Sequence, residues 1–254
     1  MDNFNLYAKY YDLLNSDKDY QSEVDYIVEL INRASNQKIN TLLDLGCGTG
    51  IHANLLTKKG FNVDGVDMSI QMVEQAKLKF ENNPALQFFE GDITKFENGK
   101  TYDVVTSLFH VMSYQNSNEA LKSAMMTAHK HLNENGLFVF DFWYGPGVLT
   151  DRPTNRVKQL ENDDIRVERK ATPELLINEN VVHVNYEINI VDKVPSREQN
   201  IKERHSMRYF FIPELSYFLK TAGFTVDSYY EWKQHDRPNT DSWNVVIVAK
   251  KQSV

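Results

Sequence analysis

Three glycines at alternate positions, Gly46, Gly48 and Gly50, form the stretch of the sequence best suited to hold a ligand. They follow an apolar run that contains Asp44, and a helical pattern begins directly after them, which indicates a strand, a tight turn and a helix. Glycine tolerates positive φ and lets a ligand approach the backbone, and the N–H groups at a helix start can bind it. The third glycine comes one residue earlier than in the dinucleotide fingerprint, and Asp44 suits a cationic ligand better than a pyrophosphate. The turn therefore predicts a ligand site of another kind.

Three further polar residues come at or just past the ends of later apolar runs. These residues are Asp67, Asp92 and His110. If the runs are parallel strands, their carboxyl ends meet at one edge of the sheet, where ligands of such folds bind. We therefore expect these side chains to gather on the same rim as the glycine turn.

Short apolar runs alternate with helical patterns through the first 143 residues, which favours a doubly wound, mostly parallel sheet in an α/β, Rossmann-like fold. The predicted strands are 41–45, 61–66, 86–89, 102–108 and 137–143, and two closing strands, 224–232 and 243–250, bring the sheet to seven. Helices are predicted within 4–36, at 51–59, after the N-cap Ser69, at 118–132 and from Pro213 to Gly223.

The pattern changes at the sequence Gly145-Pro146-Gly147, after the fifth predicted strand. Between 150 and 212 apolar and polar residues alternate with period two, which predicts three or four antiparallel strands with one buried face. In the last of these runs, the odd-numbered residues His205 to Phe211 are predicted on the apolar face and the even-numbered residues Arg204 to Phe210 on the other. The fold is thus expected to carry an antiparallel β insertion.

Composition limits the classes of function. The chain has 254 residues and a formal net charge of −7, which disfavours a nucleic-acid partner. No apolar run approaches the ~20 residues of a membrane span, and the start of the sequence has no leader pattern, so we expect no membrane partner. The single cysteine suits a cytoplasmic location, and the seven histidines show no metal-ligand spacing, so no metal is predicted.

The stretch Asp44-Leu45-Gly46-Cys47-Gly48-Thr49-Gly50 resembles motif I, Asp-x-Gly-x-Gly-x-Gly, of the class I S-adenosylmethionine (SAM)-dependent methyltransferases. Val66-Asp67-Met68-Ser69 is similar to the family motif that ends strand two, and Gly91-Asp92-Ile93 to the motif after strand three. The resemblance implies a methyltransferase with SAM as cofactor and S-adenosylhomocysteine as product. It implies that Asp67 holds the ribose hydroxyls, that Met68 lies against the adenine and that Asp92 accepts from the adenine amino group. The cofactor-binding residues that it implies are Asp44, Gly46, Cys47, Gly48, Gly50, Asp67, Met68, Gly91, Asp92, Ile93, Leu108, Tyr11 and Tyr20.

Two segments outside this core resemble a small-molecule branch of the family that includes the sugar-nucleotide N,N-dimethyltransferases. They are the sequence Tyr10-Tyr11-Asp12-Leu13-Leu14 with Lys18-Asp19-Tyr20, and the antiparallel insertion. The resemblance implies that Tyr11 and Tyr20 cover SAM or line the acceptor pocket. It also implies a SAM-binding domain made of residues 1–144 and 213–254, with 145–212 inserted for acceptor binding, as a lid or for dimerisation.

Methyl transfer from SAM is a displacement at an activated carbon, so the protein mainly has to align donor and acceptor. The expected acceptor is a small polar molecule, and an amino-sugar nitrogen is one such group. An amine must be neutral to react, so a base helps, and His110 and His205 are the candidates. Tyr144, Arg208 and Tyr209 are the candidate substrate-binding residues, with Arg208 able to face a substrate phosphate.

Other functions stay open at this point. The acceptor could be an oxygen or a carbon of a lipid-like or quinone-like molecule. An NAD-dependent oxidoreductase is less favoured, because the glycine spacing differs and a Tyr-x-x-x-Lys pair is absent. A binding module that holds SAM without catalysis is a third alternative. The protein is expected to be a monomer, or a homodimer in which the insertion pairs between subunits.

Overall fold

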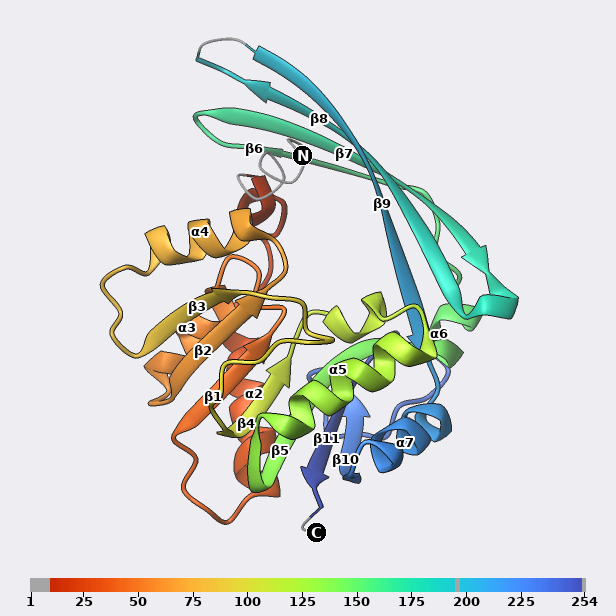
Figure 1. Cartoon of the computed structure of the whole chain (residues 1–254). Helices are drawn as coiled ribbons and strands as arrows, with labels where there is room; N and C mark the ends of the chain where they lie inside the picture. The colour runs from red at the N-terminus through yellow and green to blue at the C-terminus, as the bar shows by residue number, and fades with distance from the viewer. Residues whose placement is uncertain (1–9, 195–196, 253–254) are drawn as a thin grey trace.

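The computed structural model describes residues 10–194 and 197–252, and its centre is one sheet in the order β3-β2-β1-β4-β5-β11-β10. Five of its strands are parallel: β1 (Thr41–Leu45), β2 (Asn62–Asp67), β3 (Leu86–Glu90), β4 (Tyr102–Ser107) and β5 (Leu132–Tyr144). β11 (Asn244–Lys251) runs antiparallel to both β5 and β10 (Phe224–Glu231). The predicted α/β fold with a mostly parallel sheet is confirmed (Figure 1).

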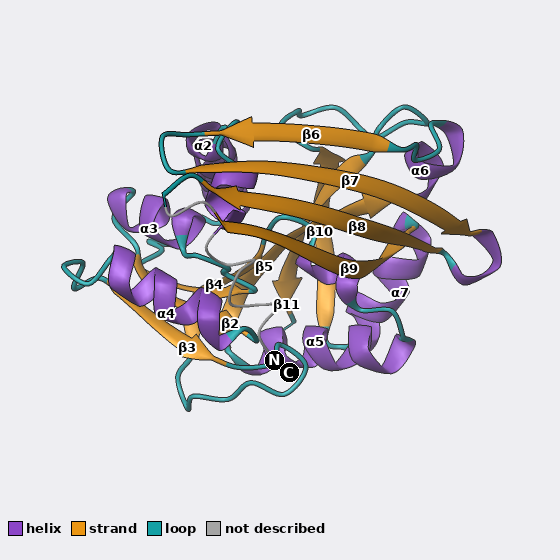
Figure 2. Cartoon of the chain, turned by 90° about the horizontal axis from the view of Figure 1, so that it is seen from above, coloured by secondary structure: helices purple, strands orange, loops and turns teal. Residues whose placement is uncertain are grey.

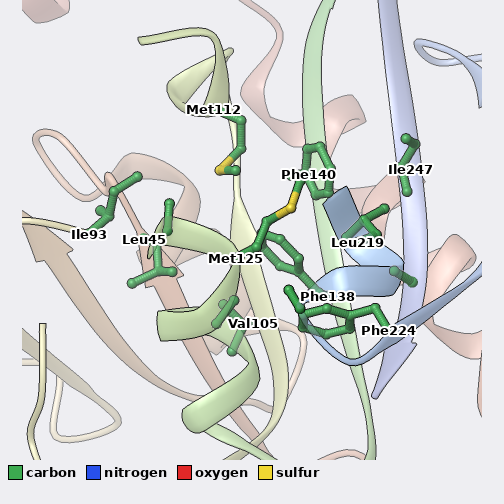
Figure 3. Packing of buried hydrophobic residues seen from close by; sticks show 14 of the residues in the cluster. Leu45, Ile93, Val105, Met112, Met125, Phe138, Phe140, Leu219, Phe224 and Ile247 are labelled. Atoms are coloured by element: carbon green, nitrogen blue, oxygen red, sulfur yellow. The ribbon is translucent and has the colours of Figure 1, made fainter. Parts of the chain in front are cut away.

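Helices cover both faces of this sheet, as a doubly wound fold requires. One face is covered by α2 (Tyr20–Ala34), α3 (Ile51–Lys58) and α4 (Ile70–Lys79), and the other by α5 (Asn118–Lys130) and α7 (Ile212–Thr221). Figure 3 shows Met125 of α5 and Leu219 of α7 among the rings of Phe138 and Phe140 of β5. The core thus lies on both sides of β5, which fixes where the carboxyl ends of the strands emerge.

Four antiparallel strands form the insertion after β5. They are β6 (Arg156–Glu161), β7 (Ile165–Leu176), β8 (Val181–Asp192) and β9 (Arg197–Phe210), with a short 3-10 turn, η2 (Ile177–Glu179), between β7 and β8. The last residues of β9 pair with the end of β5, at Trp143↔Tyr209 and Tyr144↔Phe210. The insertion therefore arches over the carboxyl-end side of the central sheet (Figures 1 and 2), and the predicted antiparallel β insertion is confirmed.

Two local predictions are wrong. A helix, α6 (Gly145–Thr150), stands where the sequence indicated only a change of pattern. Phe210, predicted on the polar face of its strand, is fully buried, and Phe211 lies beyond β9 as the N-cap of α7. The reason is that the end of β9 leaves the insertion and joins β5, where both faces of the strand are covered.

The predicted helical stretch 4–36 is confirmed over residues 10–14 and over α2, and its first residues lie outside the described ones. Ser69 caps α4 as predicted, because its hydroxyl accepts from the backbone N–H of Met72 at 3.3 Å. Within 10–194 and 197–252, no helix is both long enough and apolar enough to cross a bilayer.

Candidate active site

The glycine turn joins β1 to α3, and its three glycines adopt positive φ, 86° at Gly46, 55° at Gly48 and 79° at Gly50. A Cβ on Gly46 would lie 2.5 Å from a Val111 methyl, and one on Gly50 would lie 2.4 Å from the Phe88 ring. Packing therefore requires glycine at both positions. A Cβ on Gly48 would meet only the Tyr11 ring, at 4.0 Å, so Gly48 is the glycine that borders open space.

A small hollow lies directly above this turn. Its lining comes from the turn, from α3, from the end of β4 and from the segment before α2: Tyr11, Tyr20, Gly46, Cys47, Gly48, Thr49, Ile51, His52, Leu108 and Phe109. Tyr20 Oη is buried and has no hydrogen-bond partner among the described residues. Burial also raises the pKa of the Tyr20 phenol. This hydroxyl is a donor suited to a polar group of a ligand.

Asp67 ends β2 beside the turn. Its Oδ2 accepts from the backbone N–H of Gly48 at 2.9 Å, and its Oδ1 accepts from that of Ser69 at 2.9 Å. Burial raises the pKa of Asp67 and outweighs both hydrogen bonds, which act to lower it. The adjacent Met68 side chain is 76% exposed, an unusual exposure for a large apolar residue. A fixed acceptor beside an exposed apolar surface fits a ribose with its adenine, as SAM requires.

Asp44 lies lower, inside the sheet. It is buried, it accepts from the Thr106 hydroxyl at 2.8 Å, and burial raises its pKa. It does not line the hollow, so direct contact of Asp44 with a cofactor stays a prediction.

Of the three residues after β3, Asp92 is held by hydrogen bonds within its own turn, and Gly91 and Ile93 are held by packing. Asp92 caps its own turn, accepting from the backbone N–H of Thr94 at 2.9 Å and from its hydroxyl at 2.8 Å. Burial acts to raise the pKa of Asp92, but these hydrogen bonds and the charge of Lys95 outweigh it and lower the value. Gly91 is required by packing, since a Cβ there would lie 2.6 Å from the Phe96 ring, and Ile93 belongs to the hydrophobic core.

His110 follows β4 on the same rim, and its pairing with Asp141 was not anticipated. Its Nδ1 lies 2.6 Å from Asp141 Oδ2, at an angle away from the ideal hydrogen-bond line, and its backbone N–H donates to the same carboxylate at 3.1 Å. Asp141 is completely buried in β5. Phe109 and His110 both have left-handed backbones, with φ of 65° and 64°. Such strain in two consecutive non-glycine residues is typical of functional sites.

The candidate residues of the insertion do not share one pocket. His205 lies on the face of β9 that is turned to the central domain, with its Nδ1 2.7 Å from Tyr114 Oη. Arg208 has the opposite parity on the strand and pairs with Glu214 at 2.5 Å. Arg208 instead borders an outer hollow with Asn116, Asn118, Glu179, Val181, His183 and Ser206.

Tyr209 and Tyr144 are placed by packing. Tyr209 is completely buried and donates to the carbonyl of Ile177 at 3.3 Å, so it has no exposed surface for the substrate contact that the sequence predicts. Tyr144 stacks edge-on against Phe142, on the opposite side of β5 from Trp143. Tyr144 of β5 is only partly buried, so its contact with a substrate stays a prediction.

Sequence reasoning missed Asp141, Trp143, Tyr114 and Glu203. The signal for the first was an aspartate inside the apolar run Phe138–Tyr144, because such a residue needs a buried partner. Period two then places Trp143 on the same side of β5 as Asp141, and the Trp143 ring lies 6.3 Å from that of His110. No sequence signal linked Tyr114 to Glu203, because both reach the site through tertiary contacts.

Comparison with known proteins finds methyltransferases, the class that the sequence motifs resemble. A family model described as a methyltransferase domain matches residues 42–136. The chain is 31% identical over 147 residues to dTDP-3-amino-3,4,6-trideoxy-alpha-D-glucopyranose N,N-dimethyltransferase of Streptomyces venezuelae, covering 57% of this chain and 60% of that one. It is 30% identical over 119 residues to a ubiquinone biosynthesis O-methyltransferase of Rickettsia akari, covering 46% of each. The matches thus span about half of these relatives' length.

The fold as a whole has a counterpart among solved structures. DesVI of Streptomyces venezuelae superposes with a TM-score of 0.80 at 22% identity, covering 97% of this chain and 98% of that one. Residues 42–136 thus match a methyltransferase domain, and the chain as a whole shares the fold of a solved SAM-dependent methyltransferase of Clostridium acetobutylicum, with a TM-score of 0.81 at 21% identity, covering 98% of this chain and 99% of that one. The residues beside the hollow above Gly48 suit SAM in their chemistry, because Asp67 offers a fixed acceptor for a ribose and Met68 an exposed apolar surface for an adenine.

Proposed function

We propose that the protein transfers a methyl group from SAM to a small polar acceptor, and that the acceptor atom is an amino-sugar nitrogen. The observation that carries the proposal is the His110–Asp141 pair, which lies on the same rim as the glycine turn. An imidazole held beside a buried carboxylate is an arrangement that general acid–base catalysis uses.

Bound SAM supplies a methyl group that is already activated on a sulfonium. Asp67 would hold the ribose hydroxyls, Met68 would cover the adenine, and Tyr20 would donate to a polar group at the methionyl end. The turn at Gly48 would let the cofactor approach the backbone. These roles agree with the buried carboxylate of Asp67 and with the unpartnered Tyr20 hydroxyl.

The acceptor would lie between the rim of the central sheet and the insertion. The Phe109 and Trp143 rings neighbour His110, with centroids 5.5 and 6.3 Å from the imidazole. His110 would take the proton that a protonated amine must lose before its lone pair can attack, while the two rings exclude water. In this proposal the segment 145–212 supplies the far wall of the acceptor pocket.

The test is product analysis with purified protein and SAM. Amino-sugar nucleotides, beginning with a dTDP-3-amino sugar, are expected to gain one or two methyl groups by mass spectrometry and to release S-adenosylhomocysteine. Matched sugar nucleotides with hydroxyl in place of amine are the control. Methylation of the hydroxyl compounds alone would contradict the choice of nitrogen.

A second candidate acceptor is an aromatic hydroxyl. The aromatic side chains around His110 favour it, and the Rickettsia akari relative is named for O-methylation. Including a catechol and a hydroxylated quinone precursor in the panel distinguishes the two: methylation of only these compounds would replace the amino sugar by a phenol.

A further inference from the structure

Three side chains where the insertion meets the rim of the central sheet form a continuous chain of hydrogen bonds that the proposed function leaves unused. Glu203 Oε2 lies 3.0 Å from His205 Nε2, and His205 Nδ1 lies 2.7 Å from Tyr114 Oη. Glu203 and His205 belong to β9, and Tyr114 ends the short 3-10 helix η1 (Val111–Tyr114). These hydrogen bonds therefore connect the insertion to the segment that follows His110.

The chemistry of the groups fixes the direction of these bonds. An ionised carboxylate can only accept, so His205 Nε2 must carry a proton and donate it to Glu203. The neutral ring then has Nδ1 as its acceptor, and the Tyr114 hydroxyl is the group able to donate to it. Each proton thus already points from Tyr114 towards Glu203.

The solvent exposure of the three residues decreases from Tyr114 to Glu203. Tyr114 is 44% exposed, whereas the side chains of His205 and Glu203 are 18% and 11% exposed. Glu203 Oε1 is buried and has no hydrogen-bond partner among the described residues. A buried carboxylate with one unused oxygen stabilises positive charge on a neighbouring imidazole. Tyr114, the exposed end of these hydrogen bonds, can contact a substrate, and Glu203, the buried end, carries the charge.

Among the described residues, Tyr186 and Arg169 are two further titratable or charged groups beside these three side chains. The Tyr186 ring lies 5.1 Å from that of His205, and Arg169 lies 4.9 Å from the Tyr186 ring centroid. Arg169 stacks on Tyr186, and neither residue shares a hydrogen bond or ion pair with Glu203 among those of the described ranges. Burial raises the pKa of the Tyr186 phenol, the charge of Arg169 lowers it, and the charge of Glu203 adds to the increase, so Glu203 acts on Tyr186 as well as on His205, its hydrogen-bond partner.

We infer that Tyr114, His205 and Glu203 form a relay that carries a proton away from the methyl acceptor. This inference rests on the proposed function. The acceptor nitrogen uses its lone pair to form the new N–C bond as the S–C bond breaks, and its surplus N–H proton must then leave. That proton passes to Tyr114 Oη while the tyrosine's own proton passes to His205 Nδ1. The imidazolium so formed is stabilised by Glu203. Tyr114 is the catalytic residue here, and His205 and Glu203 act through it.

The location of Tyr114 supports this role. It lies four residues after His110, at the other end of η1, and a 3-10 helix rises about 2 Å per residue, so the two backbones are about 8 Å apart. His110 and Tyr114 are therefore held by one short element on the rim of the central sheet. Two groups at that spacing can face one small acceptor from two sides.

Turnover of a dTDP-3-amino sugar by four variants tests the relay. Tyr114→Phe removes only the hydroxyl and is expected to lower kcat by about 10²-fold, with the affinity for SAM and the KM for the sugar little changed. Glu203→Gln keeps the hydrogen bond but loses the charge, and it is expected to lower kcat by about tenfold. Tyr217→Phe on α7 and Glu187→Gln on β8, 66% and 61% exposed, are the matched controls with unchanged kcat.

A second measurement needs no turnover. Nitrogen-15 NMR of the histidines is expected to show His205 protonated on Nε2, with an Nδ1 signal that shifts in Tyr114→Phe and a tautomer preference that is lost in Glu203→Ala. Protonation on Nδ1 in the wild-type protein would overturn the relay whatever the acceptor. Undiminished kcat in Tyr114→Phe would overturn the relay alone, whereas wild-type protein that binds SAM but methylates no member of the panel would overturn the proposed function as well.

Discussion

Thr49 Oγ1 donates a 2.6 Å hydrogen bond to Asp12 Oδ1. Asp12 also forms an ion pair with Lys79 of α4, so the segment before α2 is tied to the glycine turn and to α4 at one carboxylate. Tyr11 of this segment and Tyr20, the first residue of α2, line the hollow above Gly48, so these contacts hold the segment in place over the proposed cofactor site.

Loosening that segment should make the cofactor leave faster. Thr49→Val removes the hydrogen bond without changing the size of the side chain, and a net loss of about 1 kcal/mol corresponds to about a fivefold faster dissociation of SAM. Stopped-flow fluorescence measures this rate. Thr221→Val, at the exposed end of α7, serves as the control, and equal dissociation rates in both variants would show that the Asp12–Thr49 bond has no part in retention.

The Asp141–His110 pair predicts a selective loss of turnover. Asp141→Asn keeps the shape of the side chain but removes the charge that stabilises a protonated ring, so kcat should fall by about 10²-fold or more. SAM affinity should stay unchanged, since Asp141 does not line the hollow above the turn. Steady-state kinetics with calorimetry of SAM binding separate the two effects, and Asp227→Asn on the surface is the control. A parallel loss of SAM binding would instead mean that Asp141 supports the fold of the whole rim.

Glu23 predicts a pH dependence of stability. Burial alone would raise its pKa, but the hydrogen bond with His52 and the charge of Lys18 outweigh burial and lower the pKa from 4.5 to about 2. A lowered pKa in the folded state means that this stabilisation is complete above pH 4.5 and is lost as the pH falls towards 2. The full effect is at most about 3 kcal/mol.

Glu23→Gln should therefore have a flatter stability profile than the wild type between pH 5 and pH 2.5. Urea unfolding at several pH values measures it, and Glu187→Gln, on the exposed face of the insertion, should follow the wild-type profile. Identical slopes for wild type and Glu23→Gln in that range would show that Glu23 is not selectively stabilised in the folded state.

Much of the cofactor side was predictable because it depends on local chemistry. Positive φ at Gly46, Gly48 and Gly50 follows from the tight turn, and the position of Asp67 follows from the end of an apolar run. The period-two pattern also predicted the insertion. These features need only a few consecutive residues to be specified.

The acceptor side was less predictable because it is assembled from distant segments. His110 obtains its carboxylate from β5, and His205 meets Tyr114 across 91 residues of chain. The sequence placed Arg208 and His205 on opposite faces of one strand, but it could not show that Arg208 borders a hollow separate from the one above the glycine turn. Tyr209 was taken for a substrate residue because nothing in the sequence marks the point where β9 joins β5.

Calorimetric titration of SAM into wild-type protein and Asp67→Asn tests the central assignment most directly. The wild type is expected to bind one SAM per chain, and the variant to bind about 10–100-fold more weakly, since charge-assisted hydrogen bonds to the ribose are worth about 1.5–3 kcal/mol. Asp227→Asn should bind like the wild type. No heat of binding with millimolar SAM, or equal affinity in Asp67→Asn, would contradict a cofactor held at the end of β2 beside the glycine turn.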